Sequence, residues 1–449
     1  MPIDVTDRNV LVMGLGRFGG GVGVTRWLCG AGAKVTVTDL ADQASLVESV
    51  RQLQGCPVRY RLGGHDPTDL HGMDLLVVSP AVDRRTNAFF AAAVDAGIAW
   101  TTEINLFVER CRAPWVGVTG TAGKSTASAM LQAALTDNIP TGGRVWFGGN
   151  VGRSLLGELD RIAPRDVVIL ELSSFQLDAL APLGRGPHIG LITNCWPNHL
   201  DRHHDFEAYL QAKLNLFRHQ QPGDWAVVGQ DDALIDSVER ITRKTGAQLV
   251  TARQPVEAYA LRIPGRHNQG NAACAAKVAE LLGADSSNVR QGLSKFAGLP
   301  HRLEHVGAAN GVDFYNDSKS TTPAGTATAL ASFDRPVVLL VGGQDRDDDL
   351  GPLVEAARTS ARAVVCMGPM GLRLNNLLAD SGLTVTVGLD LDQAVAQART
   401  QAEPGDVVLL SPGAPSYDQF VNYEQRGRRF GDCVRQWLSQ VKADSTAAS

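Results

Sequence analysis

A glycine-rich segment with the chemistry to hold a nucleoside phosphate lies at residues 115–130, WVGVTGTAGKSTASAM. The usual phosphate loop, G-x-x-x-x-G-K-[ST], has a glycine where Val118 stands, so the strict pattern fails by one position. The required groups are still present, because Gly120 and Gly123 offer backbone N–H groups that can hold phosphate. Lys124 can reach the β- and γ-phosphates, and Ser125 can bind Mg²⁺. We therefore predict a phosphate loop between an apolar strand and a helix.

A second glycine-rich segment, GLGRFG at residues 14–19, also follows an apolar run and opens a helical pattern. Asp39 ends the next apolar run, as the acidic residue of a dinucleotide-binding fold does. Mononucleotide and nucleotide-sugar sites use the same geometry, and a turn that only packs a strand on a helix looks alike. The identity of the nucleotide that this turn would bind therefore stays open at this point. The further glycines of GGGVG, residues 19–23, exceed what a packed helix start needs.

Glu171, in ILELSSFQL, stands at the end of a predicted strand. In an open parallel sheet this edge faces the ligand crevice, where a carboxylate can bind Mg²⁺. The same residue could instead cap the following helix. Both interpretations are kept.

A cluster of histidines follows a later strand, at residues 199–204, and invites a zinc interpretation. Its spacing matches no zinc signature, so we do not predict zinc. Lys213 lies just beyond it in FEAYLQAKLNLF, an amphipathic helical pattern. From this pattern alone we expect Lys213 to face solvent.

The elements that must position these residues alternate between apolar strands and amphipathic helices, which predicts an α/β fold with doubly wound parallel sheets. We expect strands at residues 9–14, 34–39, 74–79, 115–119, 166–172, 188–193, 336–343, 363–368 and 406–412. Polar or Pro/Gly-bearing stretches near 109–114 and 296–302 separate the series. We place three domains at 1–112, 113–299 and 300–449, each with its own parallel sheet.

Composition restricts the class of protein further. The 449 residues carry 42 basic and 47 acidic side chains, a net charge of −5, so no broad surface attracts nucleic acid or an anionic membrane. No run of about 18 apolar residues predicts a membrane span, and the N-terminus lacks the pattern of a signal peptide. The seven cysteines are scattered without a C-x-x-C, which favours reduced thiols and a cytoplasmic location.

Taken together, the motifs resemble those of the Mur ligases, ATP-dependent amide-forming enzymes of peptidoglycan synthesis. GTAGKST at 120–126 resembles the phosphate loop of this family, which also lacks the extra glycine. The resemblance covers essentially the whole chain through GLGRFG, GGNVG (148–152), ELSSFQL (171–177), NHLDRH (198–203), QAKLNLF (211–217), GRHNQGN (265–271), HRLEHV (301–306), NDSKST (316–321) and SPGAPSYDQFVNYEQRG (411–427). It implies an N-terminal Rossmann-like domain for a UDP-sugar, a central P-loop ATPase domain and a C-terminal Rossmann-like domain.

The resemblance also implies a role for individual residues. Those that would take part in catalysis are Lys124, His199, Lys213 and Lys319. Those that would bind ATP are Gly120, Thr121, Gly123, Lys124, Ser125, Thr126, Asn268, Asn271, Arg302 and Asp317. Those that would bind the UDP-sugar are Gly14, Leu15, Gly16, Arg17, Asp39, Asn150 and His199. Those that would hold the amino acid are Thr321, Arg346, Ser416 and Tyr423. Those that would bind two Mg²⁺ ions are Ser125, Glu171, His199 and a carbamylated Lys213.

The implied substrates are ATP, UDP-N-acetylmuramoyl-L-alanine and glutamate, and the implied state is a monomer. Three positions depart from the family pattern: Ala81 in place of a glycine, Arg346 in place of a lysine and Tyr423 in place of a phenylalanine. The last two concern the amino-acid site, so D- against L-glutamate stays open. The alternatives are a nicotinamide oxidoreductase, another ligase of similar plan such as folylpolyglutamate synthase, and a non-catalytic descendant of such a ligase.

Overall fold

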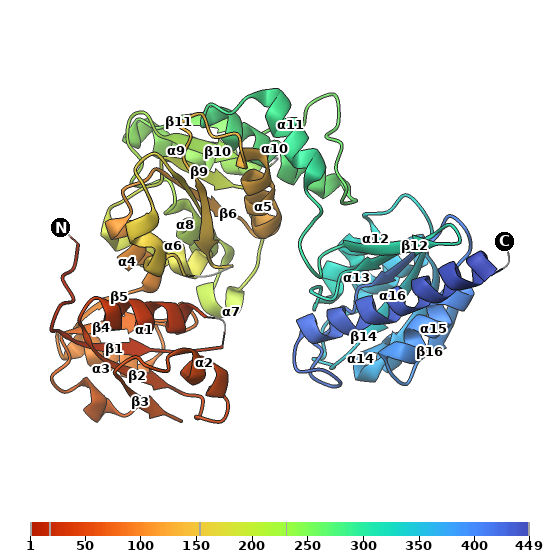
Figure 1. The fold of residues 1–449 in the computed structure, drawn as a ribbon, viewed down its shortest axis with the longest axis horizontal. Coiled ribbons are helices and arrows are strands. Elements are labelled where there is room, and N and C mark those ends of the chain that lie inside the picture. Colours follow the sequence, from red (N-terminus) through yellow and green to blue (C-terminus); the bar gives the residue numbers. More distant parts are fainter. Residues whose placement is uncertain (1, 18, 152–153, 230, 448–449) are drawn as a thin grey trace. The chain divides into compact units, whose positions relative to one another are not determined.

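The computed structural model describes residues 2–17, 19–151, 154–229 and 231–447 (Figure 1). The chain forms two compact units. Unit 1 comprises residues 1–259 and 270–293, and unit 2 comprises residues 260–269 and 294–449. Helix α10, Arg266–Leu281, therefore begins in unit 2 and continues in unit 1.

The first sheet of unit 1 is parallel, with the order β3-β2-β1-β4-β5. Its strands are β1 (Asn9–Met13), β2 (Lys34–Asp39), β3 (Val58–Leu62), β4 (Leu75–Val78) and β5 (Ala99–Thr101). Its helices are α1 (Gly20–Gly30), α2 (Val47–Gln52), η1 (Pro67–Leu70), α3 (Ala88–Asp95) and α4 (Glu103–Arg110). Apolar residues are buried on both faces of this sheet, as a doubly wound fold requires.

The second sheet of unit 1 is also parallel, with the order β11-β10-β9-β6-β8-β7. Its strands are β6 (Trp115–Thr119), β7 (Val145–Gly149), β8 (Val167–Glu171), β9 (Ile189–Ile192), β10 (Trp225–Val228) and β11 (Gln248–Thr251). Its helices are α5 (Lys124–Leu135), η2 (Leu156–Arg161), α6 (Ser174–Leu180), η3 (Ala181–Leu183), α7 (Leu200–His203), α8 (Phe206–Leu214), η4 (Asp232–Leu234), α9 (Ile235–Thr245), α10 and α11 (Ser286–Lys295). The phosphate-loop strand β6 is central and buried along its whole length.

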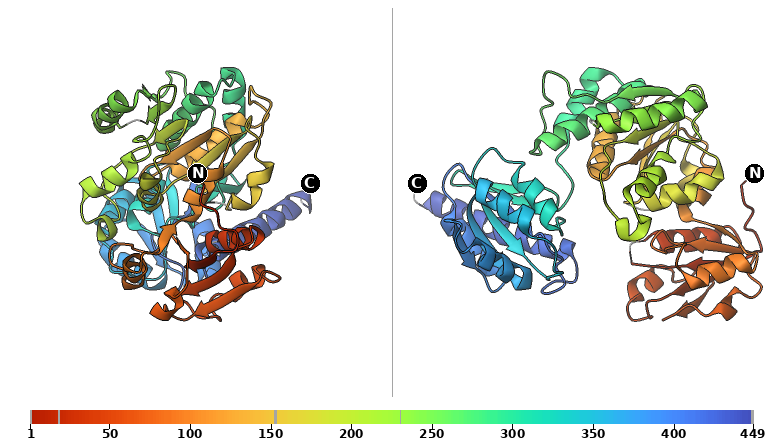
Figure 2. Two further views of the ribbon diagram at one scale, coloured as in Figure 1. Left: turned by 90° about the vertical axis from the view of Figure 1, so that its left-hand side faces the viewer. Right: turned by 180° about the vertical axis from the view of Figure 1, so that it is seen from behind.

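The sheet of unit 2 has the order β12-β13-β17-β14-β15-β16. Its strands are β12 (Glu304–Ala309), β13 (Val312–Asn316), β14 (Val337–Gly342), β15 (Ala361–Met367), β16 (Thr384–Val387) and β17 (Val407–Leu410). Its helices are α12 (Pro323–Leu330), α13 (Gly351–Ser360), α14 (Gly368–Leu378), α15 (Leu391–Gln401) and α16 (Tyr423–Ala447). Helices α15 and α16 cover one face of the sheet, and α12, α13 and α14 cover the other (Figure 2).

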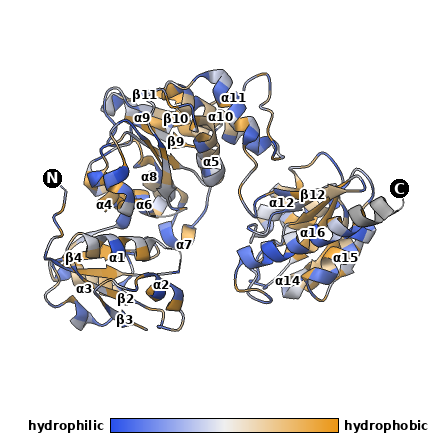
Figure 3. Ribbon diagram, in the orientation of Figure 1, coloured by the Kyte–Doolittle hydropathy of each residue, from blue (hydrophilic) through white to orange (hydrophobic). Residues whose placement is uncertain are grey.

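The predicted α/β class is confirmed, and all nine expected strands are present. The strands carry the apolar residues and the helices turn hydrophilic faces outward (Figure 3). A wholly parallel third sheet was the wrong expectation, because β12 and β13 form an antiparallel hairpin. Its two-residue turn, Asn310-Gly311, has positive φ at both positions, the geometry that favours Asn-Gly. The exact domain limits remain a prediction.

Two further features concern membrane-spanning helices and disulfide bonds. Across the described residues, no helix combines the length and the apolar character needed to cross a bilayer. The seven cysteines, which all lie within the described ranges, form no disulfide.

Candidate functional site

The phosphate loop connects β6 to α5 in a conformation that only glycine adopts without strain. Gly120 has a φ of 151° and Gly123 a φ of 81°. A Cβ atom on Gly120 would lie 2.0 Å from Thr193 Oγ1, and one on Gly123 would lie 2.3 Å from Asn271 Oδ1. Neither position therefore accepts a side chain, and Asn271 of α10, a predicted ATP-binding residue, packs directly against the loop.

Hydrogen bonds from the end of β9 hold this loop in place. Asn194 accepts from the N–H of Thr121 through its backbone carbonyl (3.0 Å) and from that of Ala122 through Oδ1 (2.9 Å). Lys124 folds back over the loop, where Nζ donates to the carbonyls of Gly120 (2.9 Å) and Thr121 (3.1 Å). Helix α5 begins without a side-chain cap, and its next residues, Ser125 and Thr126, are buried. A lysine at an uncapped helix start suits a phosphate group.

Glu171 ends β8, beside β6, and is 1% exposed. Its Oε1 accepts from Asn150 Nδ2 at 3.1 Å, but its Oε2 is buried without any hydrogen-bond partner. An orphaned carboxylate oxygen is costly unless a cation binds it, so Glu171 fits a Mg²⁺ ligand. The helix-cap alternative is excluded, since Ser173 and Gln176 form the capping box of α6.

Lys213 does not face solvent, so the expectation from the helical pattern was wrong. Helix α8 is buried on most of its circumference, and Lys213 is 1% exposed. Its Nζ donates to the carbonyl of Gly120 at 2.9 Å and lies 4.5 Å from the ring centre of Tyr209. Burial, with the charge of Lys124 as a smaller cause, lowers the pKa of Lys213 to about 7. A large fraction of this amine is therefore neutral near pH 7.

His199 precedes α7 in a left-handed conformation, with a φ of 52°. Its ring lies 5.5 Å from that of Phe175 and 6.2 Å from that of Tyr209, centre to centre. Burial lowers the pKa of His199, and the neighbouring charges of Lys124 and Lys213 act in the same direction. The ring is consequently neutral at pH 7, the form that binds a metal ion.

The neighbouring histidine has a packing role. His203 stacks on Phe175, at 5.1 Å between ring centres, and its Nε2 shares a hydrogen bond with Ser174 Oγ. Among the residues that the structure describes, no three His, Cys, Asp or Glu side chains gather as a metal site. This leaves Ser125, Glu171, His199 and Lys213 as candidate ligands on the elements around the phosphate loop.

A cavity of about 680 Å³ opens in unit 1 between the loops of the first sheet and the helices α6 and α7. The predicted UDP-sugar residues that line it are Gly14, Leu15, Gly16, Arg17, Asp39 and Asn150. Both carboxylate oxygens of Asp39 accept backbone N–H groups, from Gly16 at 2.9 Å and from Ala41 at 2.8 Å. Asp39 therefore shapes the glycine-rich turn. His199, also predicted for this site, is not part of the lining.

Sequence motifs missed several charged residues of the cavity wall. Arg84 pairs with Asp178 (2.8 Å), and Arg202 pairs with Asp83 (3.2 Å), so two ion pairs join the 79–85 loop to α6 and α7. Arg202 also lies over the ring of Phe175. Arg84 stands outside the quoted motifs and Arg202 lies within NHLDRH without a predicted role, and only the folded chain brings both to the cavity wall.

The fold also explains the extra glycines at the start of α1. A Cβ atom on Gly21 would lie 2.2 Å from the carbonyl of Leu15, and one on Gly23 would lie 2.4 Å from Ser154 Cβ. These glycines let α1 approach both its own turn and the central part of unit 1. Gly21 and Ser154 both line the cavity, so these close approaches lie at its wall.

In unit 2, the end of β13 leads into Asp317, which is 3% exposed. Burial raises its pKa to about 6, although its carboxylate accepts hydrogen bonds from the N–H of Leu303 (3.2 Å) and Ser411 Oγ (2.8 Å). Arg302 is half-buried and contributes a charge that opposes this shift. Asn268, at the start of α10, is buried and donates to the carbonyl of Pro264.

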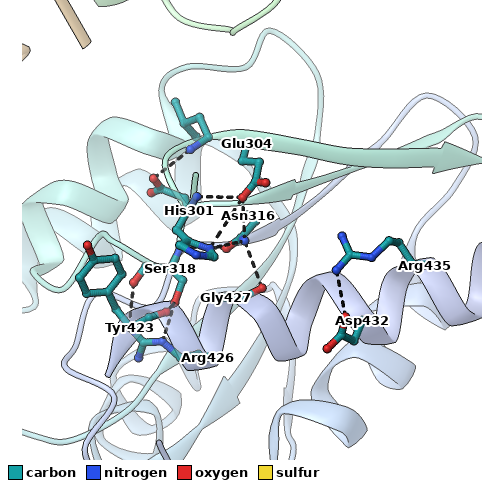
Figure 4. A network of polar contacts seen from close by, with 11 residues as sticks. His301, Glu304, Asn316, Ser318, Tyr423, Arg426, Gly427, Asp432 and Arg435 are labelled. Atoms are coloured by element: carbon teal, nitrogen blue, oxygen red, sulfur yellow. Dashed lines mark hydrogen bonds and ion pairs between the residues drawn. The ribbon is translucent and has the colours of Figure 1, made fainter. Parts of the chain in front are cut away.

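The predicted amino-acid residues lie on separate loops of unit 2. Thr321 and Tyr423 are half-buried, Ser416 is 2% exposed, and Arg346 is exposed. Ser318 Oγ donates to the carbonyl of Tyr423 at 2.8 Å, which ties the 316–321 loop to α16 (Figure 4). Lys319 Nζ lies 5.8 Å from the ring centre of Tyr423.

Family models match the chain in three consecutive segments: the Mur ligase MurD-like N-terminal domain at 8–101, the Mur ligase middle domain at 118–259, and the Mur ligase glutamate ligase domain at 301–413. The UDP-N-acetylmuramoylalanine--D-glutamate ligase of Symbiobacterium thermophilum is 34% identical over 447 residues, which cover 92% of this chain and 96% of the relative. The protein of the same name from Roseiflexus sp. is 35% identical over 462 residues, which cover 95% and 98%.

Solved structures share the fold at lower identity. The UDP-N-acetylmuramate-alanine ligase of Thermotoga maritima has a TM-score of 0.60 at 19% identity and covers 96% of this chain and 100% of its own. The folylpolyglutamate synthase of Mycobacterium tuberculosis has a TM-score of 0.55 at 16% identity, with 73% and 94% covered. Since three family models in the expected order and relatives above 30% identity span nearly all residues, the chain belongs to the Mur ligase family.

Proposed function

We propose that this protein is an ATP-dependent ligase that joins D-glutamate to UDP-N-acetylmuramoyl-L-alanine, and that it does so in the cytoplasm as a monomer. The names of the full-length relatives support the substrates. The observation that carries the chemistry is the buried Lys213 amine, which contacts the Gly120 carbonyl of the phosphate loop at 2.9 Å. A buried lysine amine gains nothing from packing, so its position on the phosphate loop supports a chemical role.

A carboxylate is a poor acyl donor at neutral pH. In the proposed reaction the γ-phosphoryl group of ATP passes to the L-alanyl carboxylate and gives an acyl phosphate and ADP. The amine of glutamate then attacks the acyl carbon and loses a proton, the acyl C–O bond breaks, and inorganic phosphate leaves. Lys124 and Lys319 are proposed to steady the migrating phosphoryl group, while Asn268, Asn271, Arg302 and Asp317 position the nucleotide.

Two Mg²⁺ ions would offset the repulsion between the carboxylate and the phosphate groups. We propose Ser125 and Glu171 as ligands of one ion, since Glu171 Oε2 is buried without a partner. His199 and a carbamylated Lys213 would bind the other. The lowered pKa of Lys213 supports this modification, because only a neutral amine adds to CO₂. The product is a carboxylate-like oxygen ligand of the kind that Mg²⁺ prefers.

The proposed binding residues divide between the two units. Gly14, Gly16 and Arg17 line the cavity that would accept the UDP-sugar, and Asn150 lines it beside Glu171. Thr321, Arg346, Ser416 and Tyr423 would hold glutamate in unit 2. An arginine at 346 can bind a carboxylate through two parallel N–H groups, so this departure is compatible with an acidic substrate.

Phosphate release tests the proposal. The enzyme is incubated with ATP, Mg²⁺ and UDP-N-acetylmuramoyl-L-alanine, together with D-glutamate, L-glutamate or neither. We expect release that depends on D-glutamate. Release with L-glutamate only would retain the mechanism and change the specificity. If neither D-glutamate nor L-glutamate gave any release, the proposed ligase activity would be rejected. A nicotinamide oxidoreductase would instead change the fluorescence of added NAD(P)H, and we expect no change.

A further inference from the structure

Arg426 is the largest fully buried side chain in the described part of the protein, at 1% exposed, and it lies within the 411–427 motif without a predicted role. It lies in the first turns of α16, three residues after Tyr423. Figure 4 shows its side chain directed from α16 toward Ser318.

The guanidinium joins two of these loops directly. Its Nε donates to Ser318 Oγ (3.0 Å), and its Nη2 donates to the carbonyl of Ser318 (2.9 Å). Its Nη1 donates to the carbonyl of Ala414 at 3.0 Å. One planar fork therefore fixes the spacing between the 316–321 loop and the 411–416 loop, which a lysine could not do.

A third loop packs against the same group. A Cβ atom on Gly343 would lie 3.2 Å from Arg426 Nη1 and 2.3 Å from the carbonyl of Pro415. Gln344 donates its N–H to that same carbonyl at 3.0 Å. The loop that carries Arg346 is thus seated on Arg426 and on the loop that carries Ser416.

The hydrogen-bond partners of Arg426 are all neutral. Within the part of the chain that the structure describes, no carboxylate lies within ion-pair distance of it, and Asp418 is the only acidic residue whose charge opposes the effect of burial. Burial lowers the pKa of Arg426 to about 10, so it remains a cation at neutral pH. Burying a cation without a carboxylate partner is unfavourable, and packing alone would favour an apolar residue here.

We propose that Arg426 is a positioning residue for the amino-acid substrate: it braces the three loops that carry Thr321, Arg346 and Ser416, and its charge favours an acidic acceptor. This inference rests on the proposed function, because those residues are the proposed glutamate ligands. Arg426 acts from beneath the loops and does not itself touch the substrate.

The test compares Arg426→Lys, which keeps the charge without the fork, and Arg426→Met, which keeps neither, with the wild-type enzyme. Arg429→Met is the matched control, since Arg429 lies three residues later on α16 and is ion-paired to Asp392 at the surface. We expect Arg426→Met to raise the KM for glutamate by about tenfold or more, as for loss of a charged hydrogen-bonding group. The KM values for ATP and the UDP-sugar should stay near those of the wild type. The KM of Arg426→Lys for glutamate should lie between those of the wild type and Arg426→Met. Arg429→Met should have the wild-type KM.

Equal increases in all three KM values, or a glutamate KM unchanged in Arg426→Met, would overturn the proposal. If Arg426→Met fails to fold, Ser318→Ala removes the Nε acceptor, together with the hydrogen bond from Ser318 Oγ to the carbonyl of Tyr423, and should raise the glutamate KM selectively. An unchanged glutamate KM in this variant would also overturn the proposal. The wild-type enzyme separates this proposal from the proposed function. If the wild-type enzyme ligates a different amino acid, the proposed acceptor, glutamate, is wrong. The same comparison of KM values, made with that amino acid, then decides the role of Arg426. No ligation by the wild type overturns both.

Discussion

At the scale of single residues, Lys213 shows where pattern reading fails. The 206–214 segment has helical spacing, and a lysine in such a pattern normally faces solvent. The tertiary fold instead buries α8 on most sides and places the amine on the phosphate loop. Hydrophobic periodicity does not report which polar residue a second element will cover. Only the motif resemblance pointed to Lys213 as a functional residue.

We predict that Lys213→Ala lowers kcat by about two to four orders of magnitude, the range for loss of a directly acting catalytic group. In the wild type, activity should fall as the pH drops below about 7, because protonation of Lys213 removes the amine that adds to CO₂. Added bicarbonate should partly offset this fall. The readouts are phosphate release and the intact mass, which should show one added CO₂ that the variant lacks.

Lys244→Ala serves as the control, since Lys244 is an exposed lysine near the end of α9. It should leave the rate, the pH profile and the bicarbonate response unchanged. A Lys213→Ala enzyme with normal activity would reject the carbamate.

Asp317 gives a stability prediction with a definite sign. Its folded-state pKa is raised from 3.8 to about 6, so ionisation opposes folding as the pH rises through this window and does so fully above it. Two pKa units correspond to at most about 3 kcal/mol. Asp317→Asn keeps the shape and the acceptor for the N–H of Leu303, and its new NH₂ group can donate to Ser411 Oγ, which reverses that hydrogen bond. It should therefore raise the melting temperature at pH 8 but not at pH 3.5. A uniform change across this pH range would contradict the prediction.

At the scale of elements, the sequence predicted nine largely buried strands, and it missed the edge strands together with the buried internal strand β10. β14 and β17 are continuous apolar runs, whereas the edge strands β3, β11 and β16 are short and partly exposed. Because these strands are only partly buried, their composition is less apolar and gives a weaker strand signal. The Asn310-Gly311 turn was a readable hairpin signal that the prediction overlooked.

The helix start of α1 could be found from sequence, but its packing could not. Gly23 carries no positive φ, and its reason is the approach of Ser154, 131 positions later in the chain. A close contact between segments so far apart leaves no local pattern. The excess of glycine is visible in the sequence. Its cause is not, because it depends on the segment that packs against α1.

We predict that Gly23→Ala raises the KM for the UDP-sugar, because its Cβ would lie 2.4 Å from Ser154 Cβ and would displace α1 from the cavity wall. Such overpacking costs about 1–3 kcal/mol of stability. Gly30→Ala is the control on the same helix, since no atom lies within 4 Å of the added Cβ. It should leave the KM unchanged and the melting temperature equal or higher. Equal behaviour of the two variants would show that the approach at Gly23 has no bearing on the cavity.

At the scale of the whole molecule, the residues proposed for the UDP-sugar and those proposed for glutamate belong to different units. The cavity and the phosphate loop lie in unit 1, and the residues proposed for glutamate lie in unit 2. The tryptophan residues are distributed unevenly between the two units. Trp27, Trp100, Trp115, Trp146, Trp196 and Trp225 belong to unit 1, and Trp437 belongs to unit 2. Tryptophan fluorescence therefore reports mainly on the unit that contains the cavity.

We predict that UDP-N-acetylmuramoyl-L-alanine raises the midpoint of thermal unfolding followed by tryptophan fluorescence, whereas glutamate alone does not. A ligand that binds only the folded unit stabilises it by about 2.7 kcal/mol at 100 times its Kd. Trp437→Phe should preserve this shift, because the signal that moves comes from unit 1. Arg346→Ala should preserve it as well and still raise the KM for glutamate, since Arg346 belongs to unit 2. Loss of the UDP-sugar shift in Arg346→Ala would mean that unit 2 takes part in binding the first substrate, and the division of roles proposed for the two units would fail.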